Sequence, residues 1–365
     1  MSEWQTFCLK DLGKIVGGAT PPTNNPKNYG NKIAWITPKD LSTLQGRYIK
    51  KGSRSISRLG FKSCSCVLLP KHAILFSSRA PIGYVAIAEK RLCTNQDFKS
   101  IIPNKKIYFE FLYYLLKYHK NNLINMGEGT TIKGIYNIAL GLFQVKIPPT
   151  YYEQQKIART LSVLDQKIEN NHKINELLHT LAHKVYEYYF KYKPKNAKLE
   201  QIIIENPKSN IMVKNAQKTQ DKYPFFTSGD NTLSYPKAII DGRNCFLNTG
   251  GNAGIKFYVG KASYSTDTWC IGANEFSDYL YLLLSSIKTH INQSFFQGTS
   301  LKHLQKNLLK KYPIYMPSAH EIKKFNQIIM PLLTLISINT RISKRLEQIR
   351  DFLLPLLLKQ QVKPQ

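Results

Sequence analysis

The chain has 365 residues, enough for two or three domains with hydrophobic cores, and its 22 Tyr and 17 Phe are typical of a packed protein. Its 52 Lys and Arg outnumber its 23 Asp and Glu, and the net charge of +29 calls for a polyanionic partner or an anionic membrane surface. The longest apolar runs, 328–338 and 352–358, are too short to span a bilayer, which favours nucleic acid over membrane. Six Cys without a C-x-x-C pair and an N-terminus without a signal-peptide core indicate a cytoplasmic protein with reduced thiols.

Residues 1–149 form the first predicted domain. It contains a turn-rich segment, GGATPPTNNP, a short apolar run, AWITPKDL, and a basic stretch, GRYIKKGSRSISRLG. The stretch AILFSSRAPIGYVAIA predicts two strands around a turn at Ala80–Gly83, and FEFLYYLLKYH predicts a helix. Pro148 and Pro149 end the last element of this domain.

Residues 150–193 contain a long predicted helix. The stretch Tyr151–Phe190 has neither Gly nor Pro, and its apolar residues recur at steps of three and four, as in a coiled coil. At about 1.5 Å per residue the helix would be roughly 60 Å long, too long for the inside of one compact domain. Asn171 and Asn175 interrupt the apolar seam near its middle.

Residues 194–317 and 318–365 repeat this plan. FLNTGGNAGIKFYV matches ILFSSRAPIGYVAI, YLYLLLSSI matches FLYYLLKYH, and Gly298–Lys302 match Gly129–Lys133. A second long helix is predicted over Glu321–Leu358, where Asn339 corresponds to Asn171 (339 − 171 = 168). The fixed offset indicates a tandem duplication. We therefore predict an α+β protein with two pseudo-repeated mixed α/β domains, each followed by a long helix.

The two helices are expected to pair as an antiparallel coiled coil. Aligned Asn171 and Asn339 amides would then satisfy each other and fix the register. The alternative is that each is an ordinary amphipathic helix on its own domain. Pro331 should kink or break the second helix. The side chains expected at the helix pair and its partner interface are Ile157, Leu161, Leu164, Ile168, Asn171, Leu178, Ile329, Leu332, Ile336, Asn339 and Leu346.

The sequence shows no convincing catalytic constellation. The nearest match to the [DN]-P-P-[YF] motif of amino-methyltransferases, 147–150, lacks the acid or amide. The glycines of GGNAG do not complete a dinucleotide-binding fingerprint. His179 and His183 lie four residues apart on the first helix, but no HExxH motif or third zinc ligand is evident, so a solvated helix face is the favoured interpretation. No metal site is predicted.

Several motifs together resemble the specificity subunit of type I restriction–modification systems. They are GGATPP, WITPKDL, SSRAPIGYVAI, TNQDFKSI, GTTIKGI and IPPTYYEQQKIARTLSVLDQKIE. The resemblance implies two target-recognition domains on paired helices that set the distance between the domains and dock two modification (methyltransferase) subunits. It also implies restriction subunits, which are ATP-dependent translocases and nucleases. S-adenosylmethionine, ATP and Mg would act in these partners, so this chain needs no cofactor.

Double-stranded DNA is the partner expected for the recognition domains. Basic side chains contact phosphates or guanine edges, and amides and hydroxyls read other base edges. In the first domain we predict contacts from Thr37, Lys39, Arg54, Arg58, Arg79, Thr130, Thr131 and Lys133. In the second we predict contacts from Thr227, Ser228, Lys256, Ser300 and Lys302. The alternative for Arg79 is an internal salt bridge, and for the G-T-[TS]-[IL]-K loop a structural turn.

The favoured function is therefore a non-catalytic subunit that recognises a bipartite DNA site. It would direct methylation and cleavage by its partners. Two other functions stay open at this point: an autonomous DNA methyltransferase or nuclease, and a coiled-coil adaptor that does not bind DNA. Methylation by the purified chain alone would favour the first. The high charge and the two globular domains argue against the second.

Overall fold

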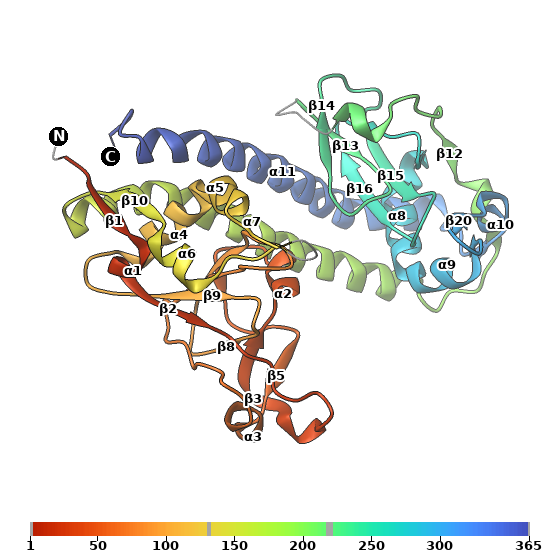
Figure 1. Ribbon diagram of the computed structural model, residues 1–365. Helices are drawn as coiled ribbons and strands as arrows, with labels where there is room; N and C mark the ends of the chain where they lie inside the picture. The colour runs from red at the N-terminus through yellow and green to blue at the C-terminus, as the bar shows by residue number, and fades with distance from the viewer. Residues whose placement is uncertain (1–2, 130–132, 217–221, 364–365) are drawn as a thin grey trace. The chain divides into compact units, whose positions relative to one another are not determined.

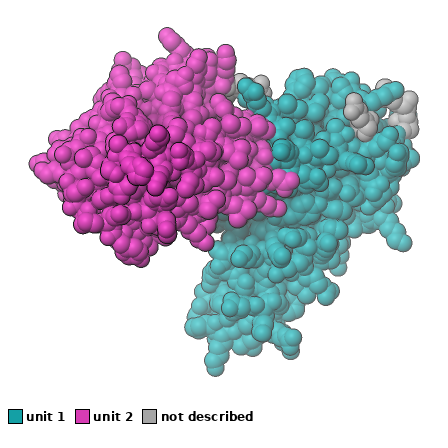
Figure 2. All heavy atoms as spheres, turned by 180° about the vertical axis from the view of Figure 1, so that it is seen from behind, with its two compact units in different colours: residues 1–169, 345–365 teal, residues 170–344 magenta. Residues whose placement is uncertain are grey.

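The computed structural model describes residues 3–129, 133–216 and 222–363, and the chain divides into two compact units. Figures 1 and 2 show the elements and the two units. Unit 1 comprises residues 1–169 and 345–365, and unit 2 comprises residues 170–344. The division cuts both long helices, α7 (Tyr151–Phe190) and α11 (Ala319–Leu358). Each unit therefore combines one globular part with one segment of each helix.

Unit 1 is built on a five-stranded sheet and a smaller three-stranded sheet. The larger sheet has the order β2-β9-β6-β7-β4, and the smaller one β5-β3-β8. A separate pair joins β1 to β10 near the start of α7. The strand bounds are β1 Gln5–Cys8, β2 Gly13–Gly17, β3 Tyr29–Ile36, β4 Tyr48–Ile49, β5 Arg54–Ile56, β6 Ile74–Phe76, β7 Val85–Ala88, β8 Cys93–Thr94, β9 Lys99–Pro103 and β10 Gln144–Ile147.

The core of unit 1 packs α4 between the larger sheet and the long-helix segments. The buried side chains include Ile74 and Phe76 of β6, Leu161 of α7, and Leu354 and Leu357 of α11. The helices are α1 Leu9–Leu12, α2 Pro38–Ser42, α3 Arg58–Lys62, α4 Phe109–Tyr118, α5 Lys120–Asn125 and α6 Asn137–Leu142, with a 3-10 turn at Pro26–Asn28. The predicted strand pair and helix of this domain are confirmed as β6, β7 and α4.

Unit 2 has a four-stranded sheet, β12-β18-β15-β16, and a three-stranded sheet, β14-β13-β17. Its strands are β11 Ala197–Lys198, β12 Ile204–Glu205, β13 Tyr223–Phe226, β14 Leu233–Tyr235, β15 Arg243–Asn248, β16 Ile255–Val259, β17 Ser263–Tyr264, β18 Thr268–Gly272, β19 Phe296–Gln297, β20 His303–Leu304 and β21 Pro313–Ile314. Its other helices are α8 Ser277–Ser286, α9 Lys288–Ser294 and α10 Lys306–Lys310. Three-residue or four-residue 3-10 turns lie at Leu199–Gln201, Val213–Ala216 and Asn274–Phe276.

The two units repeat the same strand pairings. β3 is antiparallel to β5 and parallel to β8, just as β13 is antiparallel to β14 and parallel to β17. The hairpin β6–β7 corresponds to β15–β16, and the pair β1–β10 corresponds to β11–β21. The duplication predicted from the sequence is therefore confirmed at the level of topology.

The two long helices begin with matching caps. Thr150 caps α7, because its hydroxyl accepts from the N–H of Glu153 and donates to the Glu153 carboxylate. Ser318 and Glu321 form a full capping box at the start of α11. The helix predicted over Tyr151–Phe190 is confirmed with the same bounds. Of the kink or break expected at Pro331, the break is not present, because α11 continues through this residue. Buried Ile329 and Leu333 on either side hold the helix in the core of unit 2, which offsets the missing backbone hydrogen bond.

Helix pairing within unit 2 uses a different set of amide bonds from the one predicted. Asn171 donates to the hydroxyl of Ser343 at 3.2 Å, and Asn339 donates to Oδ1 of Asn175 at 3.0 Å. Rising numbers on α7 thus meet falling numbers on α11, so these segments are antiparallel. The expected direct pairing of Asn171 with Asn339 is wrong. In the antiparallel pair, Asn171 lies opposite Ser343, one turn after Asn339. Asn339 lies opposite Asn175, one turn after Asn171.

The predicted seam residues are buried or half-buried. Ile157, Leu161 and Ile168 are buried in unit 1, and Ile329 and Ile336 are buried in unit 2. Leu164, Leu178, Leu332 and Leu346 are half-buried. The long helices are therefore packed along one side, while another side of each stays exposed.

Candidate nucleic-acid interface

Arg54 is held on an aromatic platform in the small sheet of unit 1. Its guanidinium lies 4.2 Å from the ring centroid of Tyr29 and 5.6 Å from that of Trp35. The strand register places Arg54 directly opposite Trp35, whose indole N–H donates to the carbonyl of Ala19. Arg54 is exposed and has no carboxylate partner among the described residues. Stacking therefore orients the guanidinium while leaving its N–H groups available to a ligand.

Two other basic side chains predicted to contact DNA lie close to Arg54 in the sequence. Arg58 is exposed at the first position of α3, immediately after the capping residue Ser57. Lys39 is exposed on α2, and Figure 1 shows β3, β5 and α3 together at one end of unit 1. These side chains are free to contact phosphates.

Thr37 has a structural role at the start of α2. Its backbone N–H and its hydroxyl both donate to Oδ2 of Asp40 at 2.8 Å, and Asp40 also accepts from the N–H of Ser53 at 2.7 Å. Burial raises the pKa of Asp40, but the hydrogen bonds from Ser53 and Thr37 outweigh it and hold that pKa below its usual value. This group links β3 to the segment that precedes Arg54.

Arg79 is engaged in the internal salt bridge that the sequence left open as its alternative. Its Nε donates to Oδ1 of Asp97 at 2.6 Å, while Asn95 donates to the other oxygen at 2.6 Å. The side chain of Arg79 is still 41% exposed. Arg79 also forms a β-bridge with Gly134, the residue that follows Lys133. Thr130 and Thr131 lie outside the described residues, and Lys133 is exposed.

The second domain places its recurrent loop in the same way. Gly250, after β15, forms a β-bridge with His303, and the N–H of Gly251 donates to the carbonyl of Lys302 at 2.9 Å. Gly298 has a φ of +141°, and a Cβ at this position would lie only 2.4 Å from the carbonyl oxygen of Leu301, so only glycine fits there. The side chains of Ser300 and Lys302 are exposed. Gly134 in the first domain and His303 in the second therefore form bridges at corresponding places beside the central hairpins.

Three other predicted contacts of the second domain shape one turn. Lys256 donates to the carbonyls of Thr227 and Gly229, both at 2.6 Å, and burial lowers the pKa of Lys256. The buried hydroxyl of Thr227 accepts from the N–H of Gly229 at 3.1 Å. Ser228 donates to the carbonyl of Asp267 and accepts from the N–H of Thr249. The donors of Lys256 and Ser228 are used within the protein, and the Thr227 hydroxyl accepts within the turn, so these residues position the loop.

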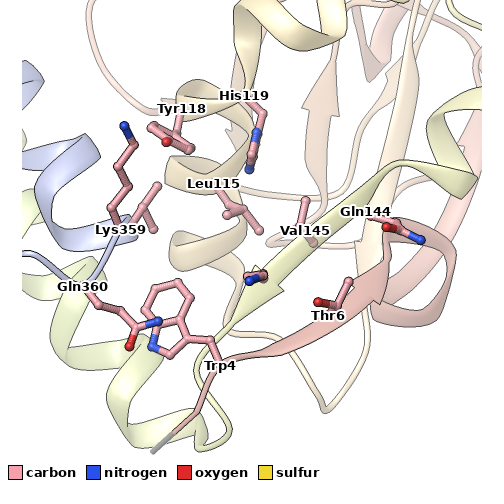
Figure 3. Close-up of a pocket in the computed structure, with 11 residues that line it drawn as sticks. Trp4, Thr6, Leu115, Tyr118, His119, Gln144, Val145, Lys359 and Gln360 are labelled. Atoms are coloured by element: carbon pink, nitrogen blue, oxygen red, sulfur yellow. The ribbon is translucent and has the colours of Figure 1, made fainter. Parts of the chain in front are cut away.

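Further candidate features among the described residues are a cavity and possible metal ligands. A cavity of about 500 Å³ in unit 1 lies between β1, β10, α4 and the end of α11 (Figure 3). Trp4, His119 and Lys359 line it, and its lining contains no carboxylate. Within residues 3–129, 133–216 and 222–363, no group of three His, Cys, Asp or Glu side chains could hold a metal ion. His179 packs against Tyr281, and burial lowers the pKa of this His. None of the helices in these ranges is long and apolar enough to cross a membrane.

The sequence did not reveal the platform residues Tyr29 and Trp35. Their role depends on the antiparallel pairing of β3 with β5, which brings Arg54 over both rings. A Trp in a short apolar run followed by a basic stretch was the available signal. It did not specify which arginine would meet the Trp.

Known proteins show where this architecture occurs. The family profile described as Type I restriction modification DNA specificity domain matches residues 1–180 and 195–348. The Type I restriction enzyme MjaIX specificity subunit of Methanocaldococcus jannaschii is 32% identical over 404 residues, covering 97% of this chain and 92% of that protein. A putative type I specificity subunit of Mycoplasma genitalium is 24% identical, covering 75% of this chain and 72% of that protein.

A solved structure has a similar fold. The crystal structure of the type I restriction-modification system S subunit from M. genitalium gives a TM-score of 0.62 at 18% identity, covering 97% of this chain and 96% of that chain. The family profile matches both halves of the sequence, in agreement with the duplicated topology. The chain therefore belongs to the type I restriction–modification DNA specificity family.

Proposed function

We propose that the chain reads a DNA site of two separate blocks, one for each globular domain, and directs partner subunits to that site. Type I specificity is a property of the family, and the duplicated fold supplies two similar readers in one chain. The net charge of +29 fits a phosphate backbone as the ligand.

One observation carries the two-block proposal. Trp35 lies beside Cys93 of β8, and Phe225 lies at the same place beside Ser263 of β17. Across the other edge, Trp35 faces Arg54, whereas Phe225 faces Leu233. The same strand position therefore carries a basic side chain in one domain and an apolar one in the other. A shared scaffold with different side chains is what two readers of different sequences require.

Among the predicted contacts, we propose that the exposed basic side chains and the exposed Ser300 hydroxyl touch DNA. The half-buried and buried polar side chains are proposed to shape the loops. The first group contains Lys39, Arg54, Arg58, Lys133, Ser300 and Lys302. The second contains Thr37, Arg79, Thr227, Ser228 and Lys256. Thr130 and Thr131 stay predictions from the sequence.

Modification subunits are proposed to dock on the exposed sides of the long helices. On the α7 segment in unit 2, Ile174, Leu177 and Leu181 recur at helical spacing and are exposed, Leu177 by 71%. Leu335 and Ile342 lie seven residues apart on α11 and are also exposed. Apolar rows of this kind suit partner helices. Because the chain is a repeat of two halves, it would bind two modification subunits, one for each half. Restriction subunits would then join the complex.

The chemistry is proposed to lie in those partners, in the cytoplasm. S-adenosylmethionine would bind the modification subunits, and ATP and Mg would bind the restriction subunits. This chain would contribute sequence selection and geometry. A DNA-binding chain that leaves catalysis to partners needs recognition surfaces and docking helices, which are the two features described above.

Genome-wide mapping of methylated sites tests this proposal. The methylated motif in cells with the gene should consist of two specified blocks around an unspecified gap, and it should vanish when the gene is deleted. The purified chain should not methylate DNA without the modification subunit. Methylation by the chain alone, or a single continuous motif, would contradict the proposed function.

A further inference from the structure

A buried arginine ties the first domain to the helix that follows it. Arg47, which precedes β4, is 3% exposed. Its Nη1 lies 2.8 Å from Oε1 of Glu110 on α4, and its Nε lies 3.1 Å from Oε1 of Glu169 on α7. The backbone N–H of Arg47 also donates to Glu169 at 2.9 Å. One residue thus contacts the core helix of the domain and the long helix.

Neighbouring polar groups complete this contact within unit 1. Tyr48 donates to Glu110 at 2.7 Å. Tyr114 on α4 donates to Asp165 of α7 at 2.6 Å, and Arg350 of α11 bonds the other oxygen of Asp165 at 2.6 Å. Nε of Arg47 lies 4.0 Å from Oδ2 of Asp165, so ion pairs and hydrogen bonds together join the domain, the α7 segment and the α11 segment.

In unit 2 a second arginine also contacts both the helix of its domain and a long helix. Arg243, at the start of β15, forms two bonds with Asp278 of α8, at 2.8 and 2.7 Å. Its Nη1 donates to Oγ1 of Thr334 on α11 at 2.9 Å, and its Nη2 donates to the carbonyl of Met330 at 3.3 Å. Burial raises the pKa of Asp278 even with Arg243 bonded to it.

The acidic partners of Arg47 and Arg243 lie at equivalent positions of the two repeats, whereas the two arginines do not. Glu110 and Asp278 are each the second residue of their helix and are separated by the repeat offset (278 − 110 = 168). Thr334 corresponds to position 166 of the first repeat, within one turn of Glu169 (334 − 168 = 166). Arg47 precedes β4, whereas Arg243 begins β15, which corresponds to β6. Different sequence positions therefore deliver a guanidinium to the same junction.

Stability alone does not account for such a junction. A buried ion pair loses much of its attraction to desolvation, and apolar side chains would hold the surfaces together as well. An arginine fork differs in that its bonds are directional, so it fixes an angle as well as a contact. Each domain is therefore oriented on its long helix by a small number of defined bonds.

We propose that Arg47 and Arg243 are positioning residues that fix the angle of each recognition domain on its helix, and so the gap between DNA blocks that the protein accepts. This inference rests on the proposed two-block function. A domain free to rock on its helix would still read its own block, but it would reach blocks at neighbouring spacings.

The test uses the complete complex with its modification subunits and a DNA library in which the gap varies by single base pairs. The variants Glu169→Met and Thr334→Val each remove the side-chain acceptor on the long helix and leave Arg47–Glu110 and Arg243–Asp278 intact. The bond from Arg243 to the carbonyl of Met330 also remains. The double variant should raise methylation at gaps one base pair from the preferred length by roughly five-fold relative to the preferred gap. The base preferences within both blocks should not change.

Matched variants control for the substitutions themselves. Glu176→Met replaces an exposed acid on α7, and Thr160→Val removes a hydroxyl that bonds only its own helix. Both should keep the gap preference of the original protein. Arg243→Lys keeps the charge but loses the fork, so it should broaden the gap as well.

Two results would overturn the inference. One is an unchanged gap preference in the folded double variant and in Arg243→Lys. The other is an equal loss of methylation at every gap, which a purely structural role would give. A protein without substitutions that methylates with no fixed gap would instead refute the proposed two-block function.

Discussion

Arg54 is oriented by two aromatic rings, and none of the described carboxylates pairs with it. Its counterpart by strand register in the second domain is Leu233. An arginine oriented in advance loses little side-chain entropy when it forms two parallel bonds to a guanine edge. The residue is therefore the best placed of the predicted contacts for reading a base.

Replacing Arg54 by Ala should relax the choice of base at one position of the first block. The expected cost is about 1–3 kcal/mol for the preferred base, with the second block unaffected. Methylation rates of the complete complex on DNA substituted at each position would measure this effect.

Arg58 provides the matched control at the residue scale. It is exposed without an aromatic platform, so Arg58→Ala should weaken binding to all sequences alike and reduce the salt dependence. If Arg54→Ala also weakened all sequences equally, Arg54 would be a phosphate contact.

Residue type alone could not distinguish side chains that contact DNA from side chains that hold the loops in place. Lys256 and Ser228 have the chemistry of DNA contacts, but their donors bond carbonyls of the chain itself. Arg79 likewise faces Asp97 from 18 positions away in the sequence. Whether a donor is already satisfied depends on tertiary neighbours, which periodicity and composition do not reveal.

Among the elements, the long helices were the most predictable. The apolar seam, the absence of Gly and Pro, and Pro148 and Pro149 before the helix predicted the bounds of α7. Asn pairing was less predictable, because the stagger of two antiparallel helices depends on the domains at their ends. Pro331 shows that buried neighbours can outweigh the roughly 3 kcal/mol cost of proline inside a helix.

The cap of α11 should respond to acid. The N–H of Ser318, the hydroxyls of Tyr315 and Ser318, and Lys193 lower the pKa of Glu321 to about 2 from its ordinary 4.5. A carboxylate with a lowered pKa in the folded state stabilises the protein above pH 4.5, and this contribution is lost as the pH falls toward 2.

Glu321→Gln should therefore lower the free energy of unfolding at neutral pH, by about 1 kcal/mol or less because the side chain is partly exposed. The difference from the original protein should shrink below pH 4.5 in denaturant titrations. A difference that stayed constant down to about pH 3 would show that the charge of Glu321 does not contribute.

For the whole molecule, the repeat predicts that the recognition domains are exchangeable. Replacing residues 1–149 by the corresponding domain of a relative should change one DNA block and leave the other intact. The graft should retain an arginine that reaches Glu169, because Arg47 makes that contact here. Sequencing of methylated sites would check both points, and a graft that altered both blocks would contradict independent reading.

Unit 1 has a consequence for how the protein is made. It is assembled from both ends of the sequence, since residues 345–365 belong to it and Leu354, Leu357 and Leu358 are buried in its core. All of unit 2 is synthesised before those leucines leave the ribosome, so unit 2 can fold first although it comes second. The core of unit 1 stays incomplete until residues 345–365 have been synthesised. A chain that ends near residue 344 would expose the core of unit 1 to proteases. Its degradation would eliminate truncated subunits that could bind DNA through the second domain alone.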